Sequence, residues 1–279
     1  MSRISYLNGK FLPHDDCLVP IDDRGLQFGD GVYEVILFKN NKLIDSNPHI
    51  ERLFRSLNEV KISHNFDKEF FQNLAKELFQ KNNLKKGSIY LQISRGVMNR
   101  IQNCPTGFEP TVVATVSPLK NFSQEEFEEG ISVITSDDIR WHRVDIKSLN
   151  LLPAVLTNQK AKDLNFNDAI FVRDGFVTEG TFANVFIVDK NDTVITRNAD
   201  NFILQGITRN RIIDLAKKRN LKVEERKFGV EELTNAKEVF LTSSTLILRS
   251  VTKVNDKIIS NKAGEISKLL REDYLNFIG

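Results

Sequence analysis

A polar, acidic stretch near the middle of the chain, Pro118–Gly130 (PLKNFSQEEFEEG), separates two segments that each carry strand and helix patterns. The stretch begins with proline, ends with glycine and has no buried periodicity beyond one short helix. Ser123-Gln124-Glu125-Glu126 would open that helix as a capping box. Because 279 residues suffice for two domains of about 100–200 residues each, we predict an N-terminal α/β domain at residues 1–118, an interdomain linker at 119–130 and a C-terminal α/β domain at 131–279.

Strand and helix patterns alternate in the first segment. Val32–Lys39 is rich in β-branched and aromatic residues, which are typical of a strand. Ser46 followed by Pro48 predicts the start of a helix, because Ser46 could cap it and the apolar residues after Pro48 recur at helical spacing. We expect a second helix from about Asp67 to Gln80, and then strands at Ile89–Ser94 and Thr111–Val116.

The second segment is richer in strands. We expect strands at Ile131–Thr135, Ala169–Arg173, Val185–Val188, Thr193–Thr196, Val239–Thr242 and Ile247–Val254. Helices are expected at about Pro153–Leu164, Thr208–Arg219 and Ala263–Phe277. The predicted fold class is therefore a two-domain protein of α+β or α/β type.

The composition argues against several classes of protein. Lys+Arg 39 against Asp+Glu 37 gives a net charge of +2, without the basic stripe expected of a nucleic-acid or membrane-surface protein. The two cysteines and four histidines make no CxxC, HxxxH or HExxH spacing, so we expect neither a disulfide framework nor a metal. No apolar run approaches the ~18 residues of a membrane span, and the first residues do not resemble a signal peptide. These features predict a soluble, cytoplasmic protein.

Lys147 is the first candidate for chemistry. It lies between Ile146 and the apolar residues Leu149, Leu151 and Leu152, so it need not face water. A lysine in apolar surroundings loses basicity because its charged form is desolvated. The neutral amine can then form a Schiff base with an aldehyde. The alternative is a lysine that extends from a strand edge and keeps its ammonium in water.

Glu179 is the second candidate, in a turn that precedes the predicted strand Val185–Val188. A carboxylate there could accept a hydrogen bond from a heterocyclic N–H. If the heterocycle is a pyridine, the carboxylate keeps its ring nitrogen protonated and the ring acts as an electron sink. The alternative is a turn glutamate held by local backbone bonds.

Three further places could bind an anion. Gly206 and Thr208 stand at a predicted helix N-terminus, whose free N–H groups suit a phosphate, although Thr208 could be an ordinary N-cap. Thr242-Ser243-Ser244-Thr245 ends a strand and could add hydroxyl donors, or could form a simple polar turn. Arg52 could oppose the phosphate with its guanidinium fork, or could be a solvated arginine paired with a neighbouring carboxylate on its helix.

Together these residues supply an amine for an aldehyde, a carboxylate for a ring nitrogen and a cradle for a phosphate. Those are the three groups by which a protein binds pyridoxal phosphate. The conjunction favours a cofactor site over the separate structural explanations, each of which is reasonable for one residue alone.

The same residues lie in motifs that resemble a known family. The chain looks like a fold-type IV pyridoxal-phosphate enzyme over nearly its whole length, and within that group it resembles the bacterial D-amino acid transaminases. The matching stretches are Asp23–Val35 (DRGLQFGDGVYEV), His49–Leu53, Asp138–Trp141, Asp145–Asn150, Thr178–Asn184 and Gly206–Arg209.

The resemblance implies a role for each candidate. Lys147 would be the Schiff-base lysine and the acid–base group, and Glu179 would bind the pyridinium nitrogen. The phosphate ligands would be Arg52, Ile207, Thr208, Ser243 and Ser244, and Leu204 would pack against the ring. The C-terminal domain would carry the lysine and most of the cofactor site, and the working unit would be a homodimer.

The resemblance also implies a reaction. Tyr33 and Arg100 would bind the substrate α-carboxylate, while Gln102 stands where the D-amino acid transaminases have a histidine and cannot supply a full positive charge. The expected substrates are a D-amino acid, D-alanine first, and 2-oxoglutarate, giving pyruvate and D-glutamate. The alternatives are a branched-chain L-amino acid aminotransferase, 4-amino-4-deoxychorismate lyase and a non-catalytic binding protein on the same fold.

Overall fold

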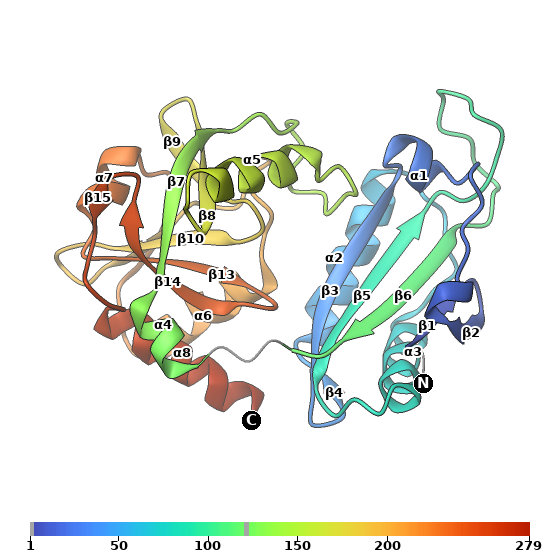
Figure 1. Cartoon of the computed structure of the whole chain (residues 1–279), viewed down its shortest axis with the longest axis horizontal. Helices are drawn as coiled ribbons and strands as arrows, with labels where there is room; N and C mark the ends of the chain where they lie inside the picture. The colour runs from blue at the N-terminus through green and yellow to red at the C-terminus, as the bar shows by residue number, and fades with distance from the viewer. Residues whose placement is uncertain (1–2, 120–122) are drawn as a thin grey trace. The chain divides into compact units, whose positions relative to one another are not determined.

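A computed structural model describes residues 3–119 and 123–279 of the chain. The chain forms two compact units: unit 1 is Met1–Lys120 with Ile146–Asn150, and unit 2 is Asn121–Asp145 with Leu151–Gly279. Each unit contains one sheet and several helices (Figure 1). Residues 120–122 of the predicted linker lie outside the described residues.

The sheet of unit 1 has six described strands, all antiparallel to their neighbours, in the order β2-β1-β6-β5-β3-β4. The strands are β1 Ile4–Leu7, β2 Lys10–Pro13, β3 Gly31–Lys39, β4 Lys42–Leu43, β5 Gly87–Ser94 and β6 Thr111–Ser117. The helices are the 3₁₀ turn η1 His14–Asp16, α1 Arg24–Phe28, α2 Ser46–Glu59 and α3 Lys68–Lys81.

The core of unit 1 lies where α2 and α3 pack on the sheet. Alternate residues of β5 are buried, as expected for a strand with one face on a core. Asp67 caps α3 by accepting a 2.7 Å hydrogen bond from the Phe70 N–H. The predicted capping role of Ser46 is wrong: Asp45, with a left-handed φ of 50°, takes the N-cap position, and Ser46 is the first residue of α2.

The sheet of unit 2 has nine strands within the described residues, in the order β12-β11-β10-β13-β14-β7-β8-β9, with β15 paired to β14. The strands are β7 Ile131–Asp137, β8 Asp168–Arg173, β9 Phe176–Gly180, β10 Asn184–Val188, β11 Val194–Thr196, β12 Val223–Glu225, β13 Glu238–Ser243, β14 Ile247–Val254 and β15 Lys257–Ile258. The helices are α4 Gln124–Glu129, α5 Leu152–Asp163, α6 Ile207–Lys218, α7 Val230–Asn235 and α8 Glu265–Ile278. Every residue of β10 is buried, so this strand runs through the core.

The predicted strands and helices are all present, most of them shifted by one or two residues at their ends. The capping box that opens α4 at Ser123 is confirmed, and the predicted mixed α/β fold is confirmed. The prediction for Glu179 needs correction, because this residue lies in strand β9 rather than in a turn. Among the described residues, no helix combines the length and apolar composition that a membrane crossing requires.

The segment Ile146–Asn150 belongs to unit 1, although the predicted boundary assigned it to the C-terminal domain. It runs along β3: the Tyr33 N–H donates to the Lys147 carbonyl at 3.0 Å, and Val32 and Ser148 form an antiparallel bridge. Backbone pairing with a strand more than 100 residues earlier therefore decides where Lys147 lies.

Candidate active site

In unit 1, the Lys147 side chain lies beside the aromatic ring of Tyr33. Its Nζ is 4.2 Å from the ring centroid, and its backbone N–H donates to Ser56 Oγ on α2 at 3.3 Å. The Tyr33 ring also lies 5.7 Å from that of Tyr90, and burial together with Tyr33 raises the pKa of Tyr90 to about 12. Lys147 is half-buried, with its backbone fixed on both sides. The amine therefore extends from a rigid position.

Arg52 forms a buried ion pair with Glu34. Its Nε and Nη2 donate to the two Glu34 carboxylate oxygens at 2.7 and 2.9 Å, and His49 Nδ1 lies 2.8 Å from the second oxygen. All three side chains are buried. The alternative of a solvated arginine paired along its helix is wrong, because the partner is on β3. This fork orients Arg52 rigidly.

The Glu34 pair makes the stability of the chain depend on pH. Burial would raise the pKa of Glu34, but Arg52 and His49 hold it well below its ordinary value of 4.5. Its stabilising contribution is therefore complete above that value and is lost as the pH falls through the folded-state pKa. Burial also lowers the pKa of His49 from 6.5, so protonation of the unfolded chain favours unfolding as the pH drops below that value.

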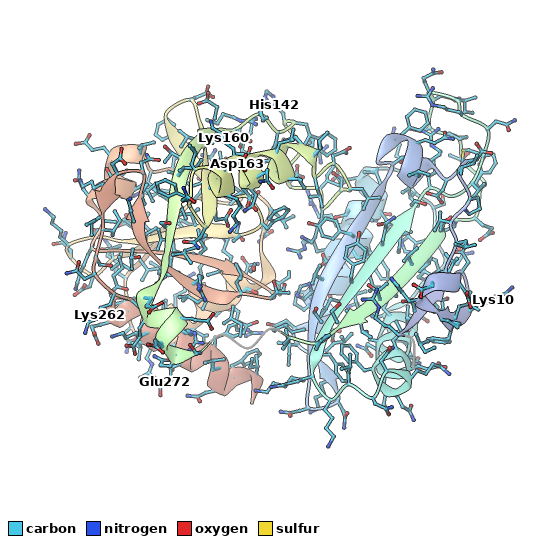
Figure 2. The ribbon with its side chains drawn as sticks, viewed as in Figure 1. Lys10, His142, Lys160, Asp163, Lys262 and Glu272 are labelled. Carbon is cyan, nitrogen blue, oxygen red and sulfur yellow. The ribbon has the colours of Figure 1, made fainter. Side chains whose placement is uncertain are left out.

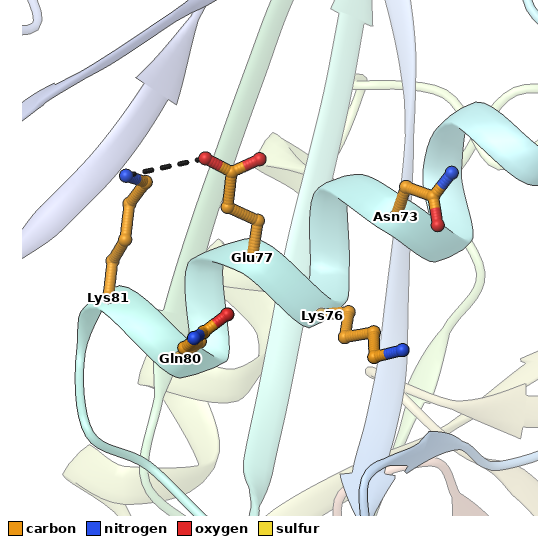
Figure 3. Close-up of a pocket in the computed structure, with 5 residues that line it drawn as sticks. All are labelled: Asn73, Lys76, Glu77, Gln80 and Lys81. Carbon is orange, nitrogen blue, oxygen red and sulfur yellow. Dashed lines mark ion pairs between the residues drawn. The ribbon is translucent and has the colours of Figure 1, made fainter.

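We expect Glu34→Gln to lower the free energy of unfolding near pH 7 by about 3–5 kcal/mol, since it leaves the buried Arg52 charge without a carboxylate. It should also flatten the loss of stability below pH 4.5. Urea unfolding at pH 7 and at a series of pH values below 4.5 measures both effects. The control is Glu77→Gln, which breaks an exposed pair with Lys81 (Figure 3). Equal stability and equal pH dependence in Glu34→Gln and the unmodified chain would contradict the prediction.

In unit 2, the Glu179 carboxylate is buried and accepts three hydrogen bonds. Arg140 Nη1 donates to Oε1 at 2.5 Å, while Asn184 Nδ2 and the Leu204 N–H donate to Oε2, each at 3.0 Å. Burial raises the pKa of Glu179, and Arg140 opposes that rise. A carboxylate offers about four lone-pair sites. One of them is left for a further donor, as the predicted ring N–H requires.

Arg140, which binds Glu179, also forms an ion pair with Asp138 that the sequence patterns did not predict. Arg140 Nε and Nη2 both donate to Asp138 at 2.8 Å, and Arg173 Nη2 lies 3.2 Å from the same carboxylate. Burial would raise the pKa of Asp138, but Arg140 holds it below its ordinary value. Two carboxylates thus balance two guanidinium groups. The motif Asp138–Trp141 was the available signal, but spacing alone gave it no role.

The start of helix α6 fits an anion. Gly206 is its N-cap, and among the described residues no side chain caps the first turn. A Cβ on Gly206 would come within 2.0 Å of Asn184 Oδ1, so the close packing requires glycine. Thr208 is buried as the second residue of the helix, and so the alternative of a Thr208 N-cap is wrong. The uncapped N–H groups at Ile207 and Thr208 suit a phosphate.

The hydroxyl residues at the end of β13 are only partly used by the turn that follows. Ser243 Oγ accepts a 3.3 Å hydrogen bond from the Leu246 N–H, as in the polar turn considered above. Ser244 is half-buried in that turn. Thr242 pairs with Asn184 in the sheet, and its buried Oγ1 has no hydrogen-bond partner among the described residues. An orphaned buried hydroxyl next to the Gly206 cradle fits a ligand that accepts hydrogen bonds.

The predicted substrate residues of unit 1 lie on β3 and in the loop that joins β5 to β6. Tyr33 is half-buried on β3, whereas Arg100 and Gln102 are exposed in the loop. The Arg100 guanidinium lies 4.7 Å from the ring centroid of Phe28. Loop side chains are thus available to a carboxylate, and Phe28 gives Arg100 a fixed surface on which to lie.

A separate hollow lies along one face of α3 (Figure 3). Its lining side chains are exposed and contain none of the predicted site residues: Asn73, Lys76, Glu77, Gln80 and Lys81. No group of three His, Cys, Asp or Glu side chains that could hold a metal occurs in the described part of the chain. The candidate active-site residues are therefore those around Lys147 and Glu179, and not those that line this hollow.

Comparisons with known proteins agree in one family. Residues 31–254 match the family Amino-transferase class IV. The D-alanine aminotransferases of Bacillus licheniformis and Listeria monocytogenes are 40% and 38% identical over 272 and 275 residues, covering 97% and 98% of this chain and 95% of each relative. The structure of the Escherichia coli branched-chain amino acid aminotransferase shares the fold, with a TM-score of 0.93 at 22% identity and coverage of 100% of this chain and 95% of that one. The chain belongs to the class IV aminotransferases.

Proposed function

We propose that the chain is a pyridoxal 5'-phosphate-dependent transaminase that transfers the amino group of a D-amino acid to a 2-oxo acid. D-alanine and 2-oxoglutarate are the first pair, giving pyruvate and D-glutamate. The identity of about two residues in five to D-alanine aminotransferases along nearly the whole chain carries this proposal. The orphaned Thr242 hydroxyl, the uncapped start of α6 and the remaining acceptor site on Glu179 support the cofactor.

Lys147 would carry the cofactor through its ε-amine, and Glu179 would accept a hydrogen bond from the N–H of its ring. The phosphate would take its hydrogen bonds from these residues: Arg52, Ile207, Thr208, Ser243 and Ser244. Leu204 would pack against the ring. When bound, the cofactor supplies an aldehyde and an electron-withdrawing ring.

The proton transfer would be the work of Lys147. Its amine would take the proton from the substrate Cα and return it at the cofactor C4′. The hydrogen bonds of its backbone with the Tyr33 N–H and Ser56 Oγ fix the position from which the amine would reach both atoms. Glu179, held by Arg140 and Asn184, would keep a negative charge beside the ring nitrogen of the cofactor.

The substrate carboxylate would be bound by Tyr33, Arg100 and Gln102. Arg100 provides the permanent charge, and Gln102 can add one neutral hydrogen bond. We therefore expect the substrate carboxylate to bind more weakly than it would to a protonated histidine at this position. The KM for the amino acid and for the 2-oxo acid should be higher than in a protein with that histidine.

A branched-chain L-amino acid aminotransferase is the alternative with a structural observation behind it, the shared fold at a TM-score of 0.93. That similarity is at 22% identity and concerns the fold alone. A lyase on the same fold, which would eliminate pyruvate from 4-amino-4-deoxychorismate, and a non-catalytic protein are the other outcomes of the test below.

The test is a half-reaction on the cofactor-loaded protein with D-alanine, L-leucine or L-glutamate added separately. We expect D-alanine alone to convert the bound cofactor to its amine form, read from the cofactor's absorption spectrum and from the pyruvate released. Conversion by L-leucine and not by D-alanine would move the protein to the branched-chain group. If none of the three amino acids converts the bound cofactor, the proposal of a transaminase is wrong.

We also propose a cytoplasmic homodimer. Leu18, Ile21 and Leu26 of unit 1 lie close together in the sequence and expose 77%, 79% and 68% of their surface, and grouped exposed apolar side chains are typical of protein interfaces. Light scattering on the purified protein measures the mass, and a monomer would contradict the proposal.

A further inference from the structure

Helix α1 and the loop that joins β5 to β6 are held together at one end of the unit 1 sheet (Figure 1). The Arg24 N–H donates to the Gly96 carbonyl at 3.0 Å, and Asp23 and Val97 form an antiparallel bridge. Gly96 has a φ of 101°, and a Cβ there would come within 2.1 Å of the Glu109 carbonyl oxygen. The base of the loop is therefore fixed by backbone contacts that tolerate little change.

The buried side chain of Arg24 extends this attachment into the loop. Its Nη1 donates to the Ile101 carbonyl at 2.6 Å, and its Nε donates to Asp30 at 2.7 Å. Ile101 is the residue between Arg100 and Gln102. Two different acceptors on one guanidinium fix its orientation, so the peptide between the two predicted carboxylate ligands is held by a rigid donor.

Phe28 provides a second connection. The Arg24 guanidinium lies 4.5 Å from its ring centroid, and the Arg100 guanidinium lies 4.7 Å from the same centroid. Both guanidinium groups can be stabilised by a cation–π interaction with the ring, and the carboxylate of Asp30 compensates the charge of Arg24. Arg24 thus acts on Arg100 through the backbone of Ile101 and through a shared aromatic ring.

Arg95 offers a matched comparison within the same cluster. It is buried like Arg24 and also binds Asp30, with Nε and Nη2 at 2.8 and 3.0 Å. Its other hydrogen bonds, however, go to the Val60 and Lys61 carbonyls at the end of α2. Burial would raise the pKa of Asp30, but Arg95 and Arg24 hold it below its ordinary value. The two arginines share a carboxylate, and Arg24 is the one whose side chain donates to the Ile101 carbonyl.

We propose that Arg24 is a positioning residue for the substrate carboxylate, which fixes the Ile101 carbonyl and thereby the directions of Arg100 and Gln102. The inference rests on the proposed function of those two residues. Lysine cannot replace Arg24, because a single ammonium on a flexible stem does not reproduce the planar fork that spans Asp30 and Ile101. A loop released at this point moves its carboxylate ligands without touching the cofactor.

The experiment compares Arg24→Lys, Arg95→Lys and Arg100→Gln in the cofactor-loaded protein. Steady-state kinetics give KM and kcat, and half-reactions compare D-alanine with D-alaninol, an amine of the same shape without the carboxylate. We expect Arg24→Lys to raise KM for D-alanine and 2-oxoglutarate about tenfold or more, since small misplacements of binding groups have effects of that size. The preference for D-alanine over D-alaninol should fall with it, kcat should change little, and Arg95→Lys should keep the preference.

Each other outcome has a distinct meaning. If Arg100→Gln leaves the preference for D-alanine unchanged, the proposed carboxylate role fails and the inference fails with it. If Arg100→Gln loses the preference while Arg24→Lys keeps it, only the positioning role of Arg24 is overturned. Should Arg24→Lys not fold, Phe28→Leu decides, because it removes the shared ring and should shift KM in the same direction. An unchanged KM in Phe28→Leu would then overturn the inference.

Discussion

Replacing Lys147 by alanine should lower the rate of transamination about 10⁴-fold or more. A positioned acid–base group contributes up to about 10⁴-fold, and the variant also loses the amine that would carry the cofactor. The backbone of residue 147 keeps its bonds to Tyr33 and Ser56, which involve main-chain atoms. The fold should therefore survive, and the loss should be one of chemistry.

Two measurements separate this role from a structural one. After borohydride reduction, mass spectrometry of the unmodified protein should find the cofactor attached to the peptide that contains Lys147, and Lys147→Ala should carry none. A small amine such as methylamine should restore part of the lost activity. The control is Lys10→Ala, since Lys10 is an exposed lysine on β2 (Figure 2). Attachment to another lysine in the unmodified protein would overturn the assignment.

Elements with a strong internal pattern could be predicted from the sequence. The apolar spacing of α3 and the β-branched run of β3 each specify their own structure, and both appear within one or two residues of the prediction. The strands that were not predicted are short or depend on a partner. The two-residue strand β4 exists because it pairs with β3, and β9 exists because it pairs with β8. Such pairing depends on the fold and leaves little trace in local periodicity.

In the candidate site, too, the sequence predicted single residues but not the contacts that depend on the fold. Lys147 and Glu179 could be proposed from the sequence, because Lys147 stands among apolar residues and Glu179 lies shortly before a predicted strand. Their partners could not. Glu34 is 18 residues from Arg52, and Arg140 is 39 residues from Glu179, so each ion pair forms only when a strand and another element come together. Resemblance pointed to the segments that hold these partners without saying what they contact.

Glu179→Gln should lower kcat about 10²-fold, because a charge-assisted hydrogen bond is worth up to about 3 kcal/mol. The amide has one acceptor, and the site needs two. If its oxygen accepts from Arg140, its NH₂ faces the donors of Asn184 and Leu204. If it is turned around, its NH₂ faces the donor of the buried Arg140. Either arrangement removes the negative charge that would hold a proton at the cofactor ring nitrogen.

The structural and the chemical effects of Glu179→Gln differ in where they are seen. A structural loss lowers the melting temperature of the protein with and without cofactor, whereas a chemical loss appears in the ¹⁵N chemical shift of a labelled cofactor ring nitrogen, which reports its protonation. We expect both in Glu179→Gln and neither in Glu272→Gln, an exposed glutamate on α8 (Figure 2). A ring nitrogen that stays protonated in Glu179→Gln would mean that this carboxylate serves Arg140, and that another group must hold the charge at the ring.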